Sequence, residues 1–177
     1  AALTDGKNEI MLATKLGKVC RFPEEKVRPM GRNASGVIGI DLNDEEGDKN
    51  EVIGMICINN PQTNVLVVSE KGYGKRSEVP EYRVQSRGGS GVITQKTTDK
   101  VGTVVGTLKV NPNQELILST DQGQVIRMRI SDISVLGRNT QGVRLINLDD
   151  KQEFVSGLAV VEDDAAAVAD ADKTNVH

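Results

Sequence analysis

The sequence predicts an all-β protein built from propeller-like, four-stranded blades. Three stretches, residues 31–37, 86–92 and 137–143, read GRNASGV, SRGGSGV and GRNTQGV, and each follows an apolar run and a glycine turn. The turn glycine and the closing glycine are 19 positions apart in every unit. These pairs are Gly17 and Gly36, Gly72 and Gly91, and Gly123 and Gly142. Four short strands per unit, at a repeat of about 50 residues, are typical of propeller blades.

Each unit opens with a hairpin. Residues 9–14, 65–69 and 115–120 are short, nearly continuous apolar runs rich in branched residues, which favours strand over helix. Continuous apolarity predicts that both faces of these strands are covered, here by the sheets of neighbouring units. A glycine in third place suits a type I turn closed by a left-handed residue. The return strands are residues 18–22, 73–77 and 124–128, each with an arginine four positions after the turn glycine.

The second half of each unit predicts two further strands. Polar connectors with one helical turn come first, at residues 23–27, 78–82 and 130–133. We expect third strands at residues 37–40, 92–95 and 143–146, and fourth strands at residues 52–58, 104–110 and 155–161. Each fourth strand carries a glycine, which marks a close backbone approach or a bulge.

The predicted blades are residues 1–58, 59–110 and 111–161, followed by an acidic, disordered tail at residues 162–177. Three blades cannot close a ring, because propellers have about 4–8 blades. Residues 3–7 stand where the end of a fourth strand is expected. We therefore expect this chain to be about three blades of a longer array whose first blades are missing.

Charge is distributed unevenly along the chain. The formal net charge is −3 over 177 residues, but five acids and one base lie from Glu162 onward. The remainder holds 21 bases and 20 acids, so the body is nearly neutral and the tail acidic. A nearly neutral average is compatible with a basic rim. The acidic tail is either a solvated end, or it competes with a bound polyanion for the basic rim. In the second case, deleting the tail would tighten the binding of the polyanion at low salt.

The residue types predict no catalytic and no metal site. The one histidine, His177, is terminal, so it forms no nucleophile pair, and with Cys20 and Cys57 it builds no zinc site. We expect two buried thiols in a reducing compartment. The sequence has no apolar run of about 18 residues, so it predicts no membrane span. Tyr73 and Tyr82 occupy repeat positions, which favours packing or a rim contact over a nucleophilic role.

Two longer runs resemble a known family. Residues 72–76 read GYGKR, and residues 130–143 read ISDISVLGRNTQGV. The first is similar to a run in the A subunit of bacterial DNA gyrase, and the second resembles the last blade of that protein; the V-x-G pattern of residues 104–106 and 155–157 also matches. The resemblance spans about residues 8–161. It implies a six-bladed β-pinwheel with duplex DNA wrapped around its outer rim, of which this chain forms the last three blades.

One motif departs from the family. The gyrase-A box reads QRRGGKG and belongs to the first blade, whereas residues 85–91 read QSRGGSG and lie in a middle unit. Two bases of the box are replaced here, by Ser86 and Ser90. We expect a degenerate copy, with the true box in the missing part of the array.

Repeated bases are the candidate DNA contacts. Phosphate contacts release counterions and give affinity without reading sequence, so wrapping needs cations repeated along a curved edge. The candidates are three loop arginines, Arg32, Arg87 and Arg138, three return-strand arginines, Arg21, Arg76 and Arg127, and two neighbouring lysines, Lys18 and Lys75. Arg28, Arg83 and Arg129 lie near them in the sequence. The alternative is that a recurring arginine pairs with a neighbouring blade and stabilises the fold.

The resemblance implies a non-catalytic, DNA-wrapping part of a type IIA topoisomerase that introduces negative supercoils with ATP. It places Mg²⁺, ATP and the cleavage tyrosine in the rest of a cytoplasmic bacterial heterotetramer of gyrase A and B subunits. One alternative is the equivalent C-terminal domain of topoisomerase IV, against which the intact GRNTQGV run argues. Another is a propeller-like module that binds protein.

Overall fold

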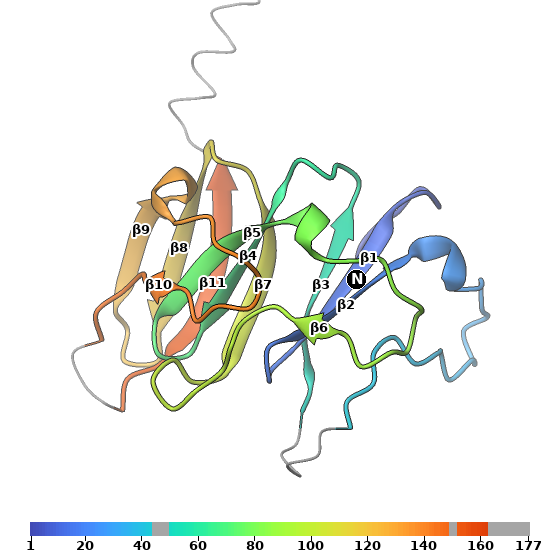
Figure 1. The fold of residues 1–177 in the computed structure, drawn as a ribbon, viewed down its shortest axis with the longest axis horizontal. Helices are drawn as coiled ribbons and strands as arrows, with labels where there is room; N and C mark the ends of the chain where they lie inside the picture. Colours follow the sequence, from blue (N-terminus) through green and yellow to red (C-terminus); the bar gives the residue numbers. More distant parts are fainter. Residues whose placement is uncertain (44–49, 149–151, 163–177) are drawn as a thin grey trace, which may run out of the picture.

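Three antiparallel sheets stand side by side in the computed structural model, which describes residues 1–43, 50–148 and 152–162 (Figure 1). The strand orders are β3-β1-β2-β6 in the first sheet, β10-β5-β4-β7 in the second and β11-β8-β9 in the third. The described elements are β1 (Glu9–Thr14), β2 (Lys18–Pro23), η1 (Glu24–Lys26), β3 (Val52–Ile58), β4 (Asn64–Ser69), β5 (Tyr73–Glu78), η2 (Val79–Glu81), β6 (Val92–Ile93), β7 (Val104–Val110), β8 (Gln114–Thr120), β9 (Val125–Arg129), η3 (Ile130–Asp132), β10 (Val143–Arg144) and β11 (Val155–Glu162). The all-β, propeller-like fold class is therefore confirmed.

The hairpins form as the glycine pattern predicts. Gly17, Gly72 and Gly123 have φ of 77°, 77° and 89°, in the left-handed region that glycine enters without steric cost. Each connector holds one short 3-10 turn, η1, η2 or η3. None of the helical segments in the described ranges could cross a bilayer.

The third strands differ from the expectation that each unit builds its own blade. β6 pairs with β2 of the preceding unit, with Val19 opposite Val92. β10 pairs in the same way with β5. Of the three predicted third strands, two form in part, at residues 92–93 and 143–144. Residues 37–40 pair with no described strand. Sequence periodicity locates a strand, but the partner is decided by the direction in which the connector leaves the sheet.

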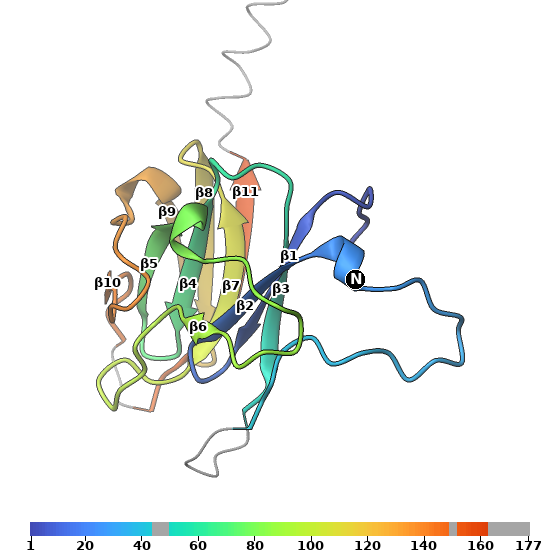
Figure 2. The ribbon, with the colours of Figure 1, turned by 45° about the vertical axis from the view of Figure 1, so that its right-hand side comes forward.

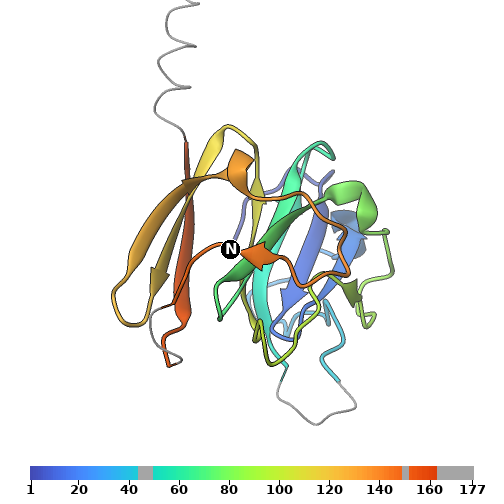
Figure 3. The ribbon, with the colours of Figure 1, turned by 60° about the vertical axis from the view of Figure 1, so that its left-hand side comes forward.

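The core lies between the sheets, and β4 is covered on both faces. Val65 and Val67 face the first sheet, Leu66 and Val68 face the third, and all four are fully buried. This confirms the inference from continuous apolarity. On the third sheet, no described element covers the face of β8 and β9 that is turned away from the second sheet (Figure 3).

The fourth strands, β3, β7 and β11, pack beside one another at the inner edges of the three sheets. A Cβ on Gly54 would lie 2.6 Å from the Thr107 hydroxyl oxygen, and one on Gly106 would lie 2.4 Å from a Leu158 methyl carbon. The strand register also shifts where each pairs with its neighbour. The predicted close approach and bulge are thus both present, and the sheets converge here.

Candidate nucleic-acid interface

The outer edges of the sheets are opposite this convergence. β6 ends the first sheet and β10 ends the second, and the long connectors before them run along the same side. Val84, in one connector, makes a parallel bridge with Arg21 of β2, and Val135 makes the equivalent bridge with Arg76 of β5. The structure separates the predicted cations into two groups: those held by contacts within the protein, and those that stay candidates for a phosphate contact.

Two of the three return-strand arginines, Arg21 and Arg76, face the next unit rather than solvent. The Arg21 guanidinium donates to the carbonyl oxygens of Val79 at 2.9 Å and Tyr82 at 2.7 Å, and it forms an ion pair with Glu9. Its side chain is 11% exposed. These contacts fasten the first sheet to η2, and they favour the structural alternative for Arg21.

Arg76 repeats this arrangement one unit later. Its guanidinium donates to the carbonyl oxygens of Ile133 at 2.8 Å and Ser131 at 3.1 Å, and to the side-chain oxygen of Asn64 at 3.4 Å. Arg76 is buried, and burial lowers the pKa of its guanidinium. It therefore fastens the second sheet to η3 and leaves no surface for a phosphate.

Lys75 is also withdrawn from solvent. Its ammonium donates to the carbonyl oxygens of Gly137 and Arg138 and, at 3.0 Å, to the hydroxyl of Thr140. The side chain is fully buried, and this burial lowers the pKa of the ammonium to about 8. The candidate DNA contact at Lys75 has no support from this geometry, because three protein oxygens already surround the charge.

Arg127 and Lys18 have different surroundings. Arg127 forms an ion pair with Glu115, and 53% of its side chain is exposed on the free face of the third sheet. Lys18 is half-buried at the start of β2, opposite Ile93 of β6. Both stay candidates for phosphate contact.

Two of the three loop arginines, Arg87 and Arg138, bind the backbone of the preceding unit. Arg87 donates to the carbonyl oxygens of Lys26 and Ile38, and Arg138 donates to that of Ile93 at 3.0 Å. Their guanidiniums are not neutralised by carboxylates of the described residues, and both residues are half-buried. Arg32, the equivalent in the first unit, is exposed and makes no hydrogen bond or ion pair with a described residue. These three stay candidates.

Four further bases are exposed, and their side chains have no described partner. Arg28 and Arg83 occupy equivalent positions in the first and second units, and both are exposed without an ion pair or hydrogen bond to any described residue. The Lys96 side chain, just after β6, and Arg129, at the end of β9, are in the same state. The repeat register identified Arg28 and Arg83, whereas Lys96 has no basic equivalent and was therefore missed.

A second missed feature surrounds Tyr73 at the start of β5. The ring lies between two cations, with the Lys100 nitrogen and the Arg144 guanidinium carbon each 5.4 Å from its centroid. Arg144 donates to the phenol oxygen at 2.9 Å, and this hydrogen bond lowers the pKa of Tyr73. Both cations are exposed, so two positive charges lie beside Tyr73 at the outer edge of the second sheet. Tyr82 is buried and hydrogen-bonded to Thr94.

Other expectations have simple outcomes. The degenerate box runs along the outer edge between η2 and β6, where Gly88 donates to the carbonyl oxygen of Gly39 at 2.9 Å. Cys20 is buried but Cys57 only half-buried. Glu162 ends β11 and accepts a hydrogen bond from Gln114, while residues 163–177 of the predicted tail lie outside the described residues.

Fold and edge together define a repeat protein whose sheets converge on one side and present repeated bases on the other. A family model described as the DNA gyrase C-terminal domain, beta-propeller, matches residues 8–59, 63–111 and 114–162. The chain belongs to this family, which confirms the resemblance seen in the sequence.

Individual relatives agree with this assignment. Over 164 residues the chain is 46% identical to the DNA gyrase A subunit of Staphylococcus aureus (strain MRSA252), covering 92% of this chain and 18% of that protein. A solved C-terminal domain of DNA topoisomerase IV aligns with a TM-score of 0.83 at 23% identity, covering 99% of this chain and 54% of that one. A solved DNA gyrase A C-terminal domain aligns with a TM-score of 0.78 at 24% identity, covering 89% of this chain and 52% of that one. The chain thus spans less than a fifth of its sequence relative and about half of each solved domain.

Proposed function

We propose that this chain binds duplex DNA along its outer edge and bends it, as the wrapping part of gyrase A. The observation that carries the proposal is the pair Arg28 and Arg83. They occupy equivalent positions in successive units, both are exposed, and neither forms an ion pair with a described side chain; Arg28 also lines a cavity on the first sheet. Exposed cations that repeat from unit to unit can neutralise successive phosphates of a duplex.

The site suits binding without sequence readout. The candidate contacts are long side chains on loops and strand ends, and such contacts to phosphate fix position while carrying no base information. Bending a site of 20–30 base pairs by 40–90° costs about 1–6 kcal/mol. Many weak contacts along a curved edge, such as those from Arg83, Lys96 and Arg144, can together offset that cost.

The chemistry of strand passage belongs elsewhere in this proposal. No group of three or more potential metal ligands occurs within the described part of the chain. ATP hydrolysis, Mg²⁺ and DNA cleavage would be supplied by gyrase B and by the remainder of gyrase A, in the cytoplasm of a bacterium. This chain would set the sense of strand passage by presenting a wrapped segment of DNA.

The test is a change in linking number. Closed circular DNA is relaxed by a separate topoisomerase with the protein bound, the protein is removed, and the topoisomers are resolved on a gel. We expect a shift that grows with protein concentration and is smaller for a variant carrying Arg28→Ala and Arg83→Ala. A longer chain with the preceding blades serves as a positive control. Duplex binding that does not weaken with added salt, or no binding at all, contradicts the proposal.

A second candidate is the equivalent domain of topoisomerase IV, favoured by the TM-score of 0.83 with that structure. The 46% identity with a gyrase A chain favours gyrase. The linking-number assay also separates the two, because strong wrapping leaves a shift, whereas binding without wrapping leaves none. A protein-binding module would show neither a shift nor salt-dependent duplex affinity.

A further inference from the structure

A pocket of about 430 Å³ lies where the first unit meets the second. It is lined by Pro23, Lys26, Val84, Gln85, Ser86 and Arg87. Pro23 ends β2 and Lys26 ends η1, whereas the other four belong to the connector between η2 and β6, which crosses to the first sheet (Figure 2). Both walls of this pocket, which we call the first junction, therefore belong to described segments. Two of the lining residues are cations and none is an acid.

The equivalent place between the second and third units, the second junction, holds a carboxylate. By the repeat register, Glu81 corresponds to Lys26 and Arg138 corresponds to Arg87. The Glu81 carboxylate accepts a hydrogen bond from the backbone nitrogen of Arg138 at 2.7 Å. At the second junction, an oxyanion that belongs to the chain itself thus satisfies the backbone of the loop.

The two loops hold the same contacts with the strand before them. The Arg87 guanidinium donates to the carbonyl oxygen of Ile38, and the Arg138 guanidinium donates to that of Ile93 at 3.0 Å. Ile38 and Ile93 are themselves equivalent positions of the repeat. Because the loops are fastened alike, the place of the Glu81 carboxylate at the second junction has a counterpart beside Arg87 at the first.

The first junction lacks the oxyanion. The backbone nitrogen of Arg87 makes no hydrogen bond with a described residue. Lys26 cannot take the part of Glu81, because an ammonium group donates hydrogen bonds and accepts none. The described acid beside Lys26 is Glu25, at 3.7 Å, and both side chains are largely exposed, at 60% and 69%. Such an exposed pair is weak, so the cation stays available to a stronger anion.

Ser86 adds a donor at the same place. Its counterpart in the third unit is Gly137, and a Cβ on Gly137 would lie 3.8 Å from a carboxylate oxygen of Glu81. The hydroxyl of Ser86 extends from this Cβ position, so it is within hydrogen-bond reach of an oxyanion bound there. The serine that replaces a base of the gyrase-A box therefore supplies a group that an anion can use.

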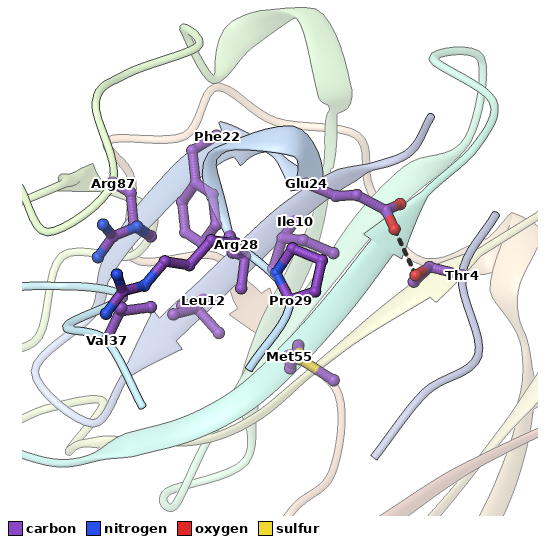
Figure 4. A pocket seen from close by; sticks show the side chains of 12 residues that line it. Thr4, Ile10, Leu12, Phe22, Glu24, Arg28, Pro29, Val37, Met55 and Arg87 are labelled. Atoms are coloured by element: carbon purple, nitrogen blue, oxygen red, sulfur yellow. Dashed lines mark hydrogen bonds between the residues drawn. The ribbon is translucent and has the colours of Figure 1, made fainter. Parts of the chain in front are cut away.

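Two further groups favour an anion over a neutral ligand. The Arg87 guanidinium carries a charge that no described carboxylate neutralises, and it also lines the neighbouring cavity on the first sheet, beside Phe22 and Arg28 (Figure 4). The amide nitrogen of Gln85 is buried without a described hydrogen-bond partner. The terminal torsion of a glutamine is broad, so this amide can turn toward a bound oxygen.

We propose that the first junction binds one phosphate-type oxyanion at the counterpart of the Glu81 carboxylate. The backbone nitrogen of Arg87 and the hydroxyl of Ser86 donate to the anion, and the Lys26 ammonium neutralises it. Lys26 and Arg87 together favour phosphate over a singly charged carboxylate. A volume of about 430 Å³ is within the range of ligand pockets, so the site admits a phosphodiester with its sugars as well as inorganic phosphate. Its use for a duplex phosphate rests on the proposed function, whereas the site itself does not.

The first experiment tests the site without DNA. Thermal unfolding is followed while inorganic phosphate replaces chloride at constant ionic strength and pH 7. A ligand that binds the folded chain raises Tm in a saturable way, whereas phosphate acting as a general salt raises it without saturation. We expect a saturable rise in the original chain, and a smaller one in Ser86→Gly, which carries the residue of the third unit.

A charge exchange gives the matched comparison. Lys26→Glu places the carboxylate of the second junction at the first, so it should raise Tm in chloride and abolish the saturable rise with phosphate. Lys7→Glu makes the same change of charge at an exposed site outside the pocket, and it should keep the rise. The absence of a saturable rise in the original chain, or equal rises in the two lysine variants, overturns the proposal.

The second experiment identifies the source of the phosphate by fluorescence anisotropy with a labelled duplex. If a backbone phosphate occupies the site, Ser86→Gly weakens duplex binding, and inorganic phosphate displaces the duplex more strongly than chloride does at equal ionic strength. If a free ion occupies it, Ser86→Gly lowers the Tm rise with phosphate and leaves duplex affinity unchanged. Either result supports the site. A chain that binds no duplex contradicts the proposed function alone, because the Tm rise is measured without DNA.

Discussion

The ammonium nitrogen of Lys75 lies 2.6 Å from the carbonyl oxygen of Gly137, although the two residues belong to different repeats. Gly137 opens the GRNTQGV loop, so this hydrogen bond fastens the second sheet to the loop that follows it. In the sequence, Lys75 stands in a basic run typical of a phosphate contact. In the fold, the same charge stabilises the junction between blades. A base in a run that resembles a phosphate contact can therefore serve the protein instead of DNA.

The first prediction concerns the pH dependence of this junction. The pKa of Lys75 is about 8 in the folded chain against 10.5 for an ordinary lysine, so the unfolded chain binds more protons between these values. Its contribution to stability therefore rises with pH across that window. Relative to Lys75→Met, the protein should gain about 2 kcal/mol between pH 7 and pH 10. Urea unfolding at both pH values measures this difference, and a constant or falling difference contradicts the assignment.

The second prediction separates structural from functional arginines. Arg76→Ala removes hydrogen bonds to three buried or partly buried acceptors and should cost about 2–4 kcal/mol of unfolding free energy. Arg83→Ala, at an exposed site without a described partner, should change stability by less than about 0.5 kcal/mol. Chemical denaturation of the two variants in parallel gives the comparison. Equal losses would mean that Arg83 also holds the fold.

The third prediction concerns the salt dependence of DNA binding. Each phosphate contact contributes about 0.9 to the slope of log affinity against log salt concentration. Arg83→Ala and Lys96→Ala should each weaken binding uniformly across sequences and lower that slope by about one. Fluorescence anisotropy with two unrelated duplexes measures both effects. Lys7→Ala, at an exposed site near the N-terminus, serves as a control with an unchanged slope.

The fourth prediction uses two glycines of similar conformation. Gly17 and Gly123 have φ of 77° and 89°, so alanine at either site costs about 1–2 kcal/mol for the left-handed backbone. At Gly17 the new Cβ would also lie 2.2 Å from the carbonyl oxygen of Gln95, whereas at Gly123 it meets nothing within 4 Å. Gly17→Ala should therefore be clearly the more destabilising of the two in thermal unfolding. Similar losses would show that the exchanged strand is held loosely.

Much of the fold could be predicted from local pattern. The apolar runs of β1, β4 and β8, the turn glycines and the glycine-bearing fourth strands each depend on residues close together in the chain. The partner of each third strand could not be predicted in this way. The pairing of Val19 with Val92 joins residues of different repeats, and three equivalent units offer a strand more than one acceptable neighbour.

For the candidate site, the sequence by itself determined that bases recur at fixed positions in successive units. Only the tertiary structure decided which of them face solvent, because burial depends on what the next unit places over each strand. Arg76 and Lys75 are covered by the turn and loop of the third unit, whereas Arg28 and Arg83 stand on connectors that no described element covers. Repetition of sequence fixes charge and spacing, but desolvation of a charge arises only from contacts between distant segments.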